Sequence, residues 1–132
     1  MKATLYRADL RYPHLQLYTA SSGSVPGLDT LYLLLEDKNV NGLGEVRINI
    51  TYLNGYSAER VLSDVIRALH QLDLRQPAST LLLNLPQLLV DFLAPTRMLL
   101  DIALHDLIAR QEGISVAQLA GDEGLADVGE VV

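Results

Sequence analysis

The 132-residue sequence contains no cysteine and no tryptophan, and only one phenylalanine. Without cysteine the chain can form no disulfide, no thiolate metal site and no thiol nucleophile. Ten basic residues stand against 16 acidic ones, and the basic residues do not cluster. With few aromatic rings for bases to stack on, this composition argues against nucleic acid as a partner.

Long apolar runs are also missing. A membrane-spanning helix needs roughly 20 consecutive apolar residues. The most apolar stretch, TLLLNLPQLLV, is interrupted by Asn84 and Pro86. The first residues carry Arg7 and Asp9 where a signal peptide would have its apolar segment. We therefore expect a cytoplasmic protein that does not bind a membrane.

The length and the apolar content fit one domain with a modest core of its own, since 49% of the residues are hydrophobic. The net charge is −6. Much of this imbalance lies in the last twelve residues, GDEGLADVGEVV, which contain four acidic residues and no Lys or Arg.

The first half of the chain has the two-residue period of β-strands. Alternation from Thr4 to Tyr12 predicts a half-buried strand with Tyr6 and Leu10 on its apolar face and Arg7 opposite. The segment HLQLYT extends this strand or pairs again, and the small residues from Ala20 to Gly27 predict a loop.

Leu31–Glu36 is apolar on both alternations, which predicts a central strand covered on both faces or lying at a domain interface. Asp, Asn and Gly42 then predict a hairpin turn before a return strand, Leu43 to Ile50. That strand places Val46 and Ile48 on one face and Glu45 on the other.

Three helices are expected after these strands. Ser57 is a suitable N-cap for the first, with Val61, Val65 and Ile66 facing inward and Asp64 outward. Residues 81–93 predict a buried second helix, in which Pro86 suits a first turn or a kink. Thr96–Glu112 predicts a long third helix that ends at Gly113, and a short helix follows at 116–119. The positions of the long helix predicted to face inward are Leu99, Leu100, Ala103, Leu104, Leu107 and Ile108. The fold class is therefore α+β: a small antiparallel sheet of about three strands, then three or more helices.

No motif in this sequence carries recognisable chemistry. Gly42-Leu-Gly44 lacks the third glycine of a dinucleotide-binding loop, so we interpret it as a turn glycine followed by a close-packed one. Asp101 and His105 lie one helical turn apart and could share a metal ion, but an ordinary surface pair is the favoured interpretation. Catalytic residues and metal ligands are thus predicted to be absent.

Two segments remain as candidates for binding, because loops held on a rigid sheet often carry specificity. They are Thr19–Gly27 and Thr51–Tyr56. For either segment alone, a solvent-facing connection is the more usual interpretation, and the tyrosines could equally pack at the edge of the sheet.

Larger patterns in the chain resemble a known family. Asn41-Gly-Leu-Gly-Glu45, the capped helix at Ser57, Ile102-Ala-Leu-His-Asp-Leu-Ile-Ala-Arg110 and Gly113-Ile-Ser-Val-Ala-Gln-Leu-Ala-Gly121 occur in sequence. Together they resemble the N-terminal capping domain of the enolase superfamily, in particular its mandelate racemase and muconate lactonizing enzyme branch. The resemblance covers nearly the whole chain.

This resemblance implies that the chain is a substrate-specificity lid over a (β/α)₈ barrel. The barrel of such an enzyme, a racemase, cycloisomerase or dehydratase, holds Mg²⁺ and the base that abstracts a proton α to a carboxylate. The cap contributes two loops that close over a small carboxylate substrate. By loop membership, the residues expected to contact substrate are Ser21, Ser22, Ser24, Tyr52, Asn54 and Tyr56.

The resemblance also sets expectations for the domain limits. Residues 1–120 correspond to the cap, and 121–132 to an acidic connector toward a barrel, which needs about 200 residues. We therefore expect a truncated, inactive piece of an isomerase or lyase, with no cofactor in this chain and Mg²⁺ in the parent enzyme. The alternative is a free-standing, non-catalytic binding or self-association module. In either case an exposed apolar face leads us to expect a homo-oligomer.

Overall fold

A computed structural model of the chain describes residues 1–11, 17–19, 23–25, 27–49 and 55–114; at 9–11, 17–19, 23–25 and 27 it describes the backbone only. The described elements, in chain order, are β1 (Lys2–Arg11), β2 (Leu17–Thr19), β3 (Gly23–Val25), β4 (Gly27–Asp37), β5 (Val40–Arg47), α2 (Ala58–Gln71), α3 (Ala78–Leu88) and α4 (Ala94–Glu112). The fold is α+β, as predicted: an antiparallel sheet followed by helices.

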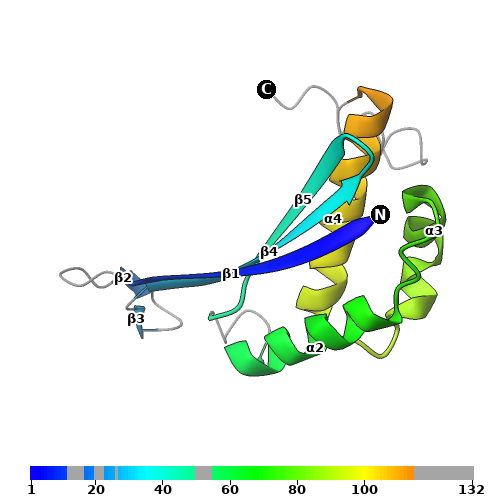
Figure 1. Ribbon diagram of the computed structural model, residues 1–132. Helices are drawn as coiled ribbons and strands as arrows, with labels where there is room; N and C mark the ends of the chain where they lie inside the picture. The colour runs from blue at the N-terminus through cyan, green and yellow to red at the C-terminus, as the bar shows by residue number, and fades with distance from the viewer. Residues whose placement is uncertain (12–16, 20–22, 26, 50–54, 115–132) are drawn as a thin grey trace, which may run out of the picture.

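The main sheet has the order β1-β4-β5, with both neighbouring pairs antiparallel. The predicted central strand is therefore confirmed as central. Figure 1 shows α2, α3 and α4 on one side of this sheet, with the β2–β3 hairpin at the end of β1 and β4 remote from α3. No helix within the described ranges is long and apolar enough to cross a membrane.

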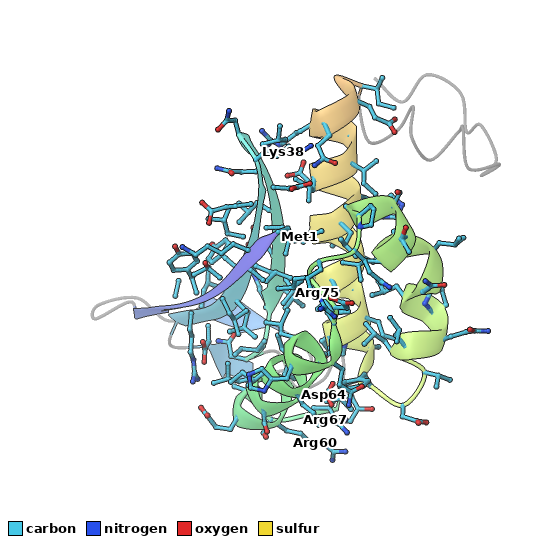
Figure 2. The ribbon with its side chains drawn as sticks, turned by 45° about the vertical axis from the view of Figure 1, so that its right-hand side comes forward. Met1, Lys38, Arg60, Asp64, Arg67 and Arg75 are labelled. Atoms are coloured by element: carbon cyan, nitrogen blue, oxygen red, sulfur yellow. The ribbon has the colours of Figure 1, made fainter. Side chains whose placement is uncertain are left out.

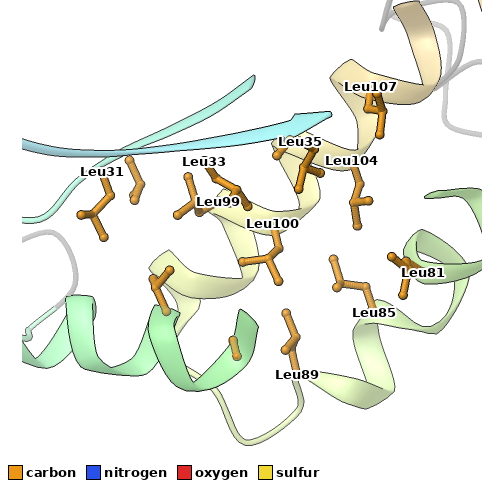
Figure 3. Packing of buried hydrophobic residues seen from close by; sticks show 14 of the residues in the cluster. Leu31, Leu33, Leu35, Leu81, Leu85, Leu89, Leu99, Leu100, Leu104 and Leu107 are labelled. Carbon is orange, nitrogen blue, oxygen red and sulfur yellow. The ribbon is translucent and has the colours of Figure 1, made fainter. Parts of the chain in front are cut away.

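The core lies between the sheet and the helices. Directly paired residues of antiparallel strands point to the same face, and Leu33 of β4 pairs with Leu5 of β1. Leucines from β4, α3 and α4 interdigitate in this layer, as Figure 3 shows. Its largest fully buried side chains include Leu31, Leu33, Leu35, Leu81, Leu89, Leu99, Leu100, Leu104 and Leu107.

The prediction for the buried face of β1 is wrong. Leu5 packs against the core, whereas Tyr6, placed on the apolar face by the sequence, is 52% exposed. Pairing with β4 explains the reversal, because Leu5 lies opposite the buried Leu33 while Tyr6 lies opposite Tyr32, which is half-buried. Alternation within β1 alone could not reveal which side the helices cover.

The far face of β4 is not covered by the described residues. Tyr32 and Leu34 remain half-buried, although the strand is apolar on both alternations. The expectation of cover on both faces is therefore wrong for the described part of the chain. The alternative that this face lies at a domain interface stays a prediction.

The segment Ala20–Gly27, predicted to be without regular structure, contains part of a hairpin instead. Gly23–Val25 pairs with Leu17–Thr19, and β4 already begins at Gly27. Such pairing is made by backbone hydrogen bonds, so small residues form it without the alternation that identifies a strand. The second pairing suggested for HLQLYT is confirmed at Leu17–Thr19.

The β4–β5 turn forms where predicted, but Gly42 does not shape it. Lys38 has the left-handed conformation, with φ 57°, and Asp37 pairs with Val40 across the turn. Gly42 lies inside β5, where an added Cβ would be 2.5 Å from Leu107 Cβ of α4. The strand therefore lies directly against this helix.

Helix α2 begins as predicted, because the Ser57 hydroxyl accepts a hydrogen bond from the Arg60 amide at 3.2 Å. Val61 and Val65 are fully buried. The prediction for two other positions is wrong: Ile66 is 42% exposed, and Asp64 is buried. Helical periodicity predicts Asp64 on the polar face, but Leu93 and Thr96 at the start of α4 donate hydrogen bonds to its carboxylate, and a helical pattern does not contain such partners.

Helix α3 is amphipathic rather than buried all round. Leu81 and Leu85 face the core, but Leu83 is 80% exposed. The helix also begins at Ala78, before the predicted residue 81, and Pro86 lies in its last turn.

Helix α4 is confirmed at its predicted inward positions and at its end. Gly113 takes a left-handed conformation with φ 69°, and the Ile114 amide donates to the Ala109 carbonyl at 3.0 Å. These contacts satisfy carbonyls that the end of a helix leaves open. The short helix predicted at 116–119 lies outside the described residues.

Candidate functional site

The described strand ends that flank the two predicted binding segments lie at one end of the main sheet. Residues 12–26 connect β1 to β4 beyond the pair Arg11 and Gly27, and residues 48–57 follow β5 beyond the pair of Arg47 with Thr30. The β4–β5 turn is at the opposite end. The antiparallel topology therefore brings the described residues that flank each segment, which we call its root, to the same end of the sheet.

Most residues predicted to contact substrate lie outside the described part of the chain. This holds for Ser21, Ser22, Tyr52 and Asn54. The backbone of Ser24 lies in β3 opposite Tyr18, and its side chain is outside the description. Their contact with substrate stays a prediction.

Tyr56 is the predicted contact residue whose side chain is described. Its ring is half-buried against the core, and the Arg60 guanidinium lies over it at 5.0 Å from the ring centroid. Figure 2 shows Arg60 projecting outward from α2. Tyr56 is the last residue of the predicted segment Thr51–Tyr56, and its ring packs against the core, as the alternative interpretation of the tyrosines requires.

An ion-pair cluster that sequence reasoning missed joins this end of the sheet to α2. Arg7 of β1 donates to Asp29 of β4 through both Nε (2.9 Å to Oδ1) and Nη2 (2.7 Å to Oδ2). The same Nη2 donates to Glu59 Oε1 of α2 at 2.9 Å. The hydrogen bond to Asp29, followed by that to Glu59, raises the pKa of the Arg7 guanidinium above its ordinary value.

The register between β1 and β4 shows which sequence feature points to this cluster: charged residues on the face of the sheet that the helices cover. Arg7 pairs with Leu31 and Asp29 pairs with Asp9, so both side chains belong to the face that the helices cover. A charged residue on that face requires a partner, because burial of an unpaired charge is costly. Without the β1–β4 register, the alternation within β1 predicts that Arg7 and Asp9 face solvent.

A second buried carboxylate holds α4 in place. Asp64 Oδ2 accepts from the Thr96 hydroxyl at 2.6 Å and from the Leu93 amide at 2.9 Å, and Oδ1 accepts from Arg67 at 2.9 Å. Leu93 is the N-cap of α4 and provides no side-chain acceptor, so Asp64 performs the capping role from another helix. Figure 2 shows Asp64 and Arg67 together on α2. Burial opposes ionisation, but these three hydrogen bonds outweigh it and hold the pKa of Asp64 below its ordinary value.

Asp101 and His105 form the expected pair on α4. The His105 Nδ1 lies 2.9 Å from the Asp101 carbonyl oxygen and 3.4 Å from its carboxylate. Among the described residues no three His, Asp or Glu side chains come close enough together to hold a metal ion. This part of the chain therefore does not fit a Mg²⁺ site.

An open groove runs between α3 and α4 on the surface. One hollow of about 600 Å³ includes Leu83 and His105, and a neighbouring hollow of about 510 Å³ includes Pro86 and Met98; both include Leu82 and Asp101. The lining is mostly apolar. The groove offers an apolar contact surface.

This architecture, a three-stranded antiparallel sheet backed by three described helices, matches the N-terminal domain of enolase-superfamily enzymes of the mandelate racemase and muconate lactonizing type. The fold expected from the resemblance is thereby confirmed. No protein-family model matches the chain, and no curated protein matches its sequence.

Three of the matching solved structures show how far the similarity extends. An L-Ala-D/L-Glu epimerase superposes with TM-score 0.63 at 24% identity, over 91% of this chain and 33% of the epimerase. A putative mandelate racemase/muconate lactonizing enzyme from Silicibacter pomeroyi gives 0.64 at 19% identity, over 90% and 32%. An enolase family member from Agrobacterium tumefaciens with homology to dipeptide epimerases, described with bound sodium, L-Ala-L-Glu and an ordered loop, gives 0.60 at 25%, over 90% and 33%. The chain thus spans about a third of the length of each.

Proposed function

We propose that the chain is the specificity cap of an enolase-superfamily enzyme that abstracts a proton α to a carboxylate. One observation carries the proposal: three such structures match about 90% of this chain, while the match spans only a third of theirs. The two thirds outside the match would correspond to the (β/α)₈ barrel, the proposed partner of this domain.

The topology supports the role of a lid. Both candidate segments are connected to the sheet at the same end of its strands, so the mouth of one barrel could face both segments. The proposed contact residues remain those of the two segments, with Tyr56 placed at the root of the second. Residues 121–132 would connect the cap to the barrel, and this division of the chain stays a proposal.

The proposed chemistry belongs to the barrel. Mg²⁺ held there would stabilise the enediolate formed on proton removal. The residues of the described cap would bind and orient the distal part of a small carboxylate substrate and exclude water from it. The matched L-Ala-D/L-Glu epimerase, and the matched enolase family member described with bound L-Ala-L-Glu, make an acidic dipeptide a suitable first substrate to test.

Turnover measurements test the proposal. The purified 132-residue chain is expected to leave L-Ala-L-Glu unchanged in the presence of Mg²⁺, and an active dipeptide epimerase serves as the control for the assay. Measurable epimerisation by the chain would contradict the proposal. The coding sequence beyond Val132 provides an independent test, because an open frame that encodes a barrel supports a cap.

A free-standing self-association module is the second candidate. The observation in its favour is the exposed apolar surface, which includes Leu83 and Met98 beside the α3–α4 groove and Tyr6 and Leu43 on the far face of the sheet. Such surface would be covered in a homo-oligomer. A stop codon directly after Val132 supports this candidate, and a monomer at high concentration by light scattering counts against it.

A further inference from the structure

The Arg7 cluster joins the roots of both proposed lid segments. Asp29 lies two residues into β4, directly after the connection that contains the β2–β3 hairpin. Its backbone carbonyl accepts from the Ile48 amide at 2.9 Å, the last such contact before residues 50–54. Glu59 belongs to the first turn of α2, where the second segment ends.

The two halves of the cluster differ in burial. Asp29 is 6% exposed, so its carboxylate depends on the bidentate arginine for compensation of its charge. The Glu59 side chain is 74% exposed, and an ion pair in solvent contributes little to stability. The contact between Arg7 and Glu59 is therefore poorly explained as a source of stability, although it joins the first turn of α2 to β1.

We propose that Arg7 is a positioning residue that sets the relative placement of the β2–β3 hairpin and the first turn of α2. The planar guanidinium suits this role because its fork fixes one carboxylate in two hydrogen bonds and still reaches a second. A lysine at the same position would keep the charge without the fork. A role of Arg7 in substrate recognition rests on the proposed function, whereas its role in positioning the two elements does not.

The absence of cysteine permits a direct measurement. Spin labels at Ser24→Cys in β3 and Ser63→Cys in α2 report the distance between β3 and α2 by pulsed electron paramagnetic resonance. A second pair, Lys38→Cys with Ser79→Cys in α3, reports the distance between the β4–β5 turn and a helix that the Arg7 cluster does not contact. General loosening of the fold would broaden both distance distributions, whereas loss of positioning broadens the first.

Arg7→Met and Glu59→Ala are expected to broaden the 24–63 distribution and leave the 38–79 distribution unchanged. Arg7→Lys should give a width between wild type and Arg7→Met. Arg75→Met is the matched control, since it removes an exposed arginine–aspartate pair elsewhere. In Glu59→Ala the melting temperature should change by less than about 4 °C, because the pair is exposed, so this variant tests the proposal even if Arg7→Met does not fold.

Two results would overturn the inference: an unchanged 24–63 distribution in Glu59→Ala and Arg7→Lys, or equal broadening of both label pairs. Neither result depends on turnover. A coding sequence without a barrel would instead contradict the proposed function and leave the measured role of Arg7 intact.

Discussion

At the scale of single residues, two side chains that sequence patterns class as surface charges turn out to organise the packing. Asp64 sits on the polar side of its helix by periodicity, yet it caps α4 through Leu93 and Thr96. Arg7 sits on the polar side of its strand, yet it pairs with a buried aspartate. Arg7, and Asp64 apart from its bond to Arg67, have their partners outside their own element, and a local pattern does not contain those partners.

Replacement of Asp64 by Asn should make stability less dependent on pH. At pH 7 we expect the variant to lose about 1–3 kcal/mol in the free energy of unfolding, because hydrogen bonds to a charged acceptor are lost or weakened. The folded pKa of Asp64 is lowered, so the unfolded chain binds more protons as the solution is acidified. The stabilisation is complete above the ordinary aspartate pKa of about 4 and disappears as the pH falls through the lower folded value.

Urea unfolding between pH 7 and pH 3 measures the difference in free energy of unfolding between wild type and Asp64→Asn. This difference should become smaller toward pH 3. The exposed Asp73 also has a lowered pKa, caused by its hydrogen bond to Arg75, and Asp73→Asn serves as the control with a much smaller effect. A difference that stays constant over the whole range would contradict the assignment.

Gly44 illustrates a steric requirement at the same scale. An added Cβ would lie 2.6 Å from the Leu99 carbonyl oxygen, which belongs to the backbone of α4 and cannot rotate away. We expect Gly44→Ala to cost about 3 kcal/mol in the free energy of unfolding, near the upper end of typical overpacking. Leu43→Ala, on the exposed side of the same strand, should cost less than about 1 kcal/mol in the same chemical denaturation experiment.

At the scale of elements, the decisive arrangement is the packing of α4 on the edge strand β5. The glycines allow close approach, and Asp106 of α4 accepts from the backbone amide of Leu43 at 2.8 Å. An edge strand normally presents unpaired amides that invite association with another chain. Here a helix side chain satisfies one of them.

Asp106→Ala should therefore expose the edge locally. The Leu43 amide is expected to exchange with solvent about fivefold faster, which corresponds to roughly 1 kcal/mol of lost hydrogen bonding. Amide exchange followed by NMR provides the measurement. Arg110→Ala is the control, because it removes the exposed Arg110–Asp106 pair and keeps the acceptor for Leu43; equal acceleration in both variants would contradict the interpretation.

At the scale of the whole molecule, the described part of the chain combines a formed core with a substantial apolar surface. The core lies entirely on one side of the sheet, while Leu83 and Val90 of the helical layer are 80% and 65% exposed. A domain that packs against a second, larger domain would have this distribution. The proposed cap function and its barrel partner account for it directly.

Addition of Mg²⁺ should leave the thermal unfolding of this chain unchanged. A ligand present at 100 times its dissociation constant stabilises the native state by about 2.7 kcal/mol, and the described residues contain no group of three possible metal ligands. Calorimetry with and without Mg²⁺ measures the effect, with Na⁺ at equal ionic strength as the control. A rise specific to Mg²⁺ would place a metal site in this chain and contradict the assignment of that site to the barrel.

From the sequence alone it was possible to predict the fold class, the order of the three main-sheet strands and the three described helices, and the buried face of α4. Leu99, Ala103 and Leu107 recur at helical spacing, and Ser57 and Gly113 mark helix ends through local chemistry, so these features need no distant partner. The family resemblance, carried by the same segments, led to the fold that the solved structures share.

Tertiary structure alone decided which face of β1 is buried, why Gly42 is required and what holds Asp64 and Arg7. Each depends on contacts between elements far apart in the chain: the β1–β4 register, the approach of α4 to β5, and hydrogen bonds that span up to 52 residues in the case of Arg7 and Glu59. A periodic pattern records which side of an element is apolar. It does not record which neighbour lies there, and a charged side chain is placed by its partner more than by its own polarity.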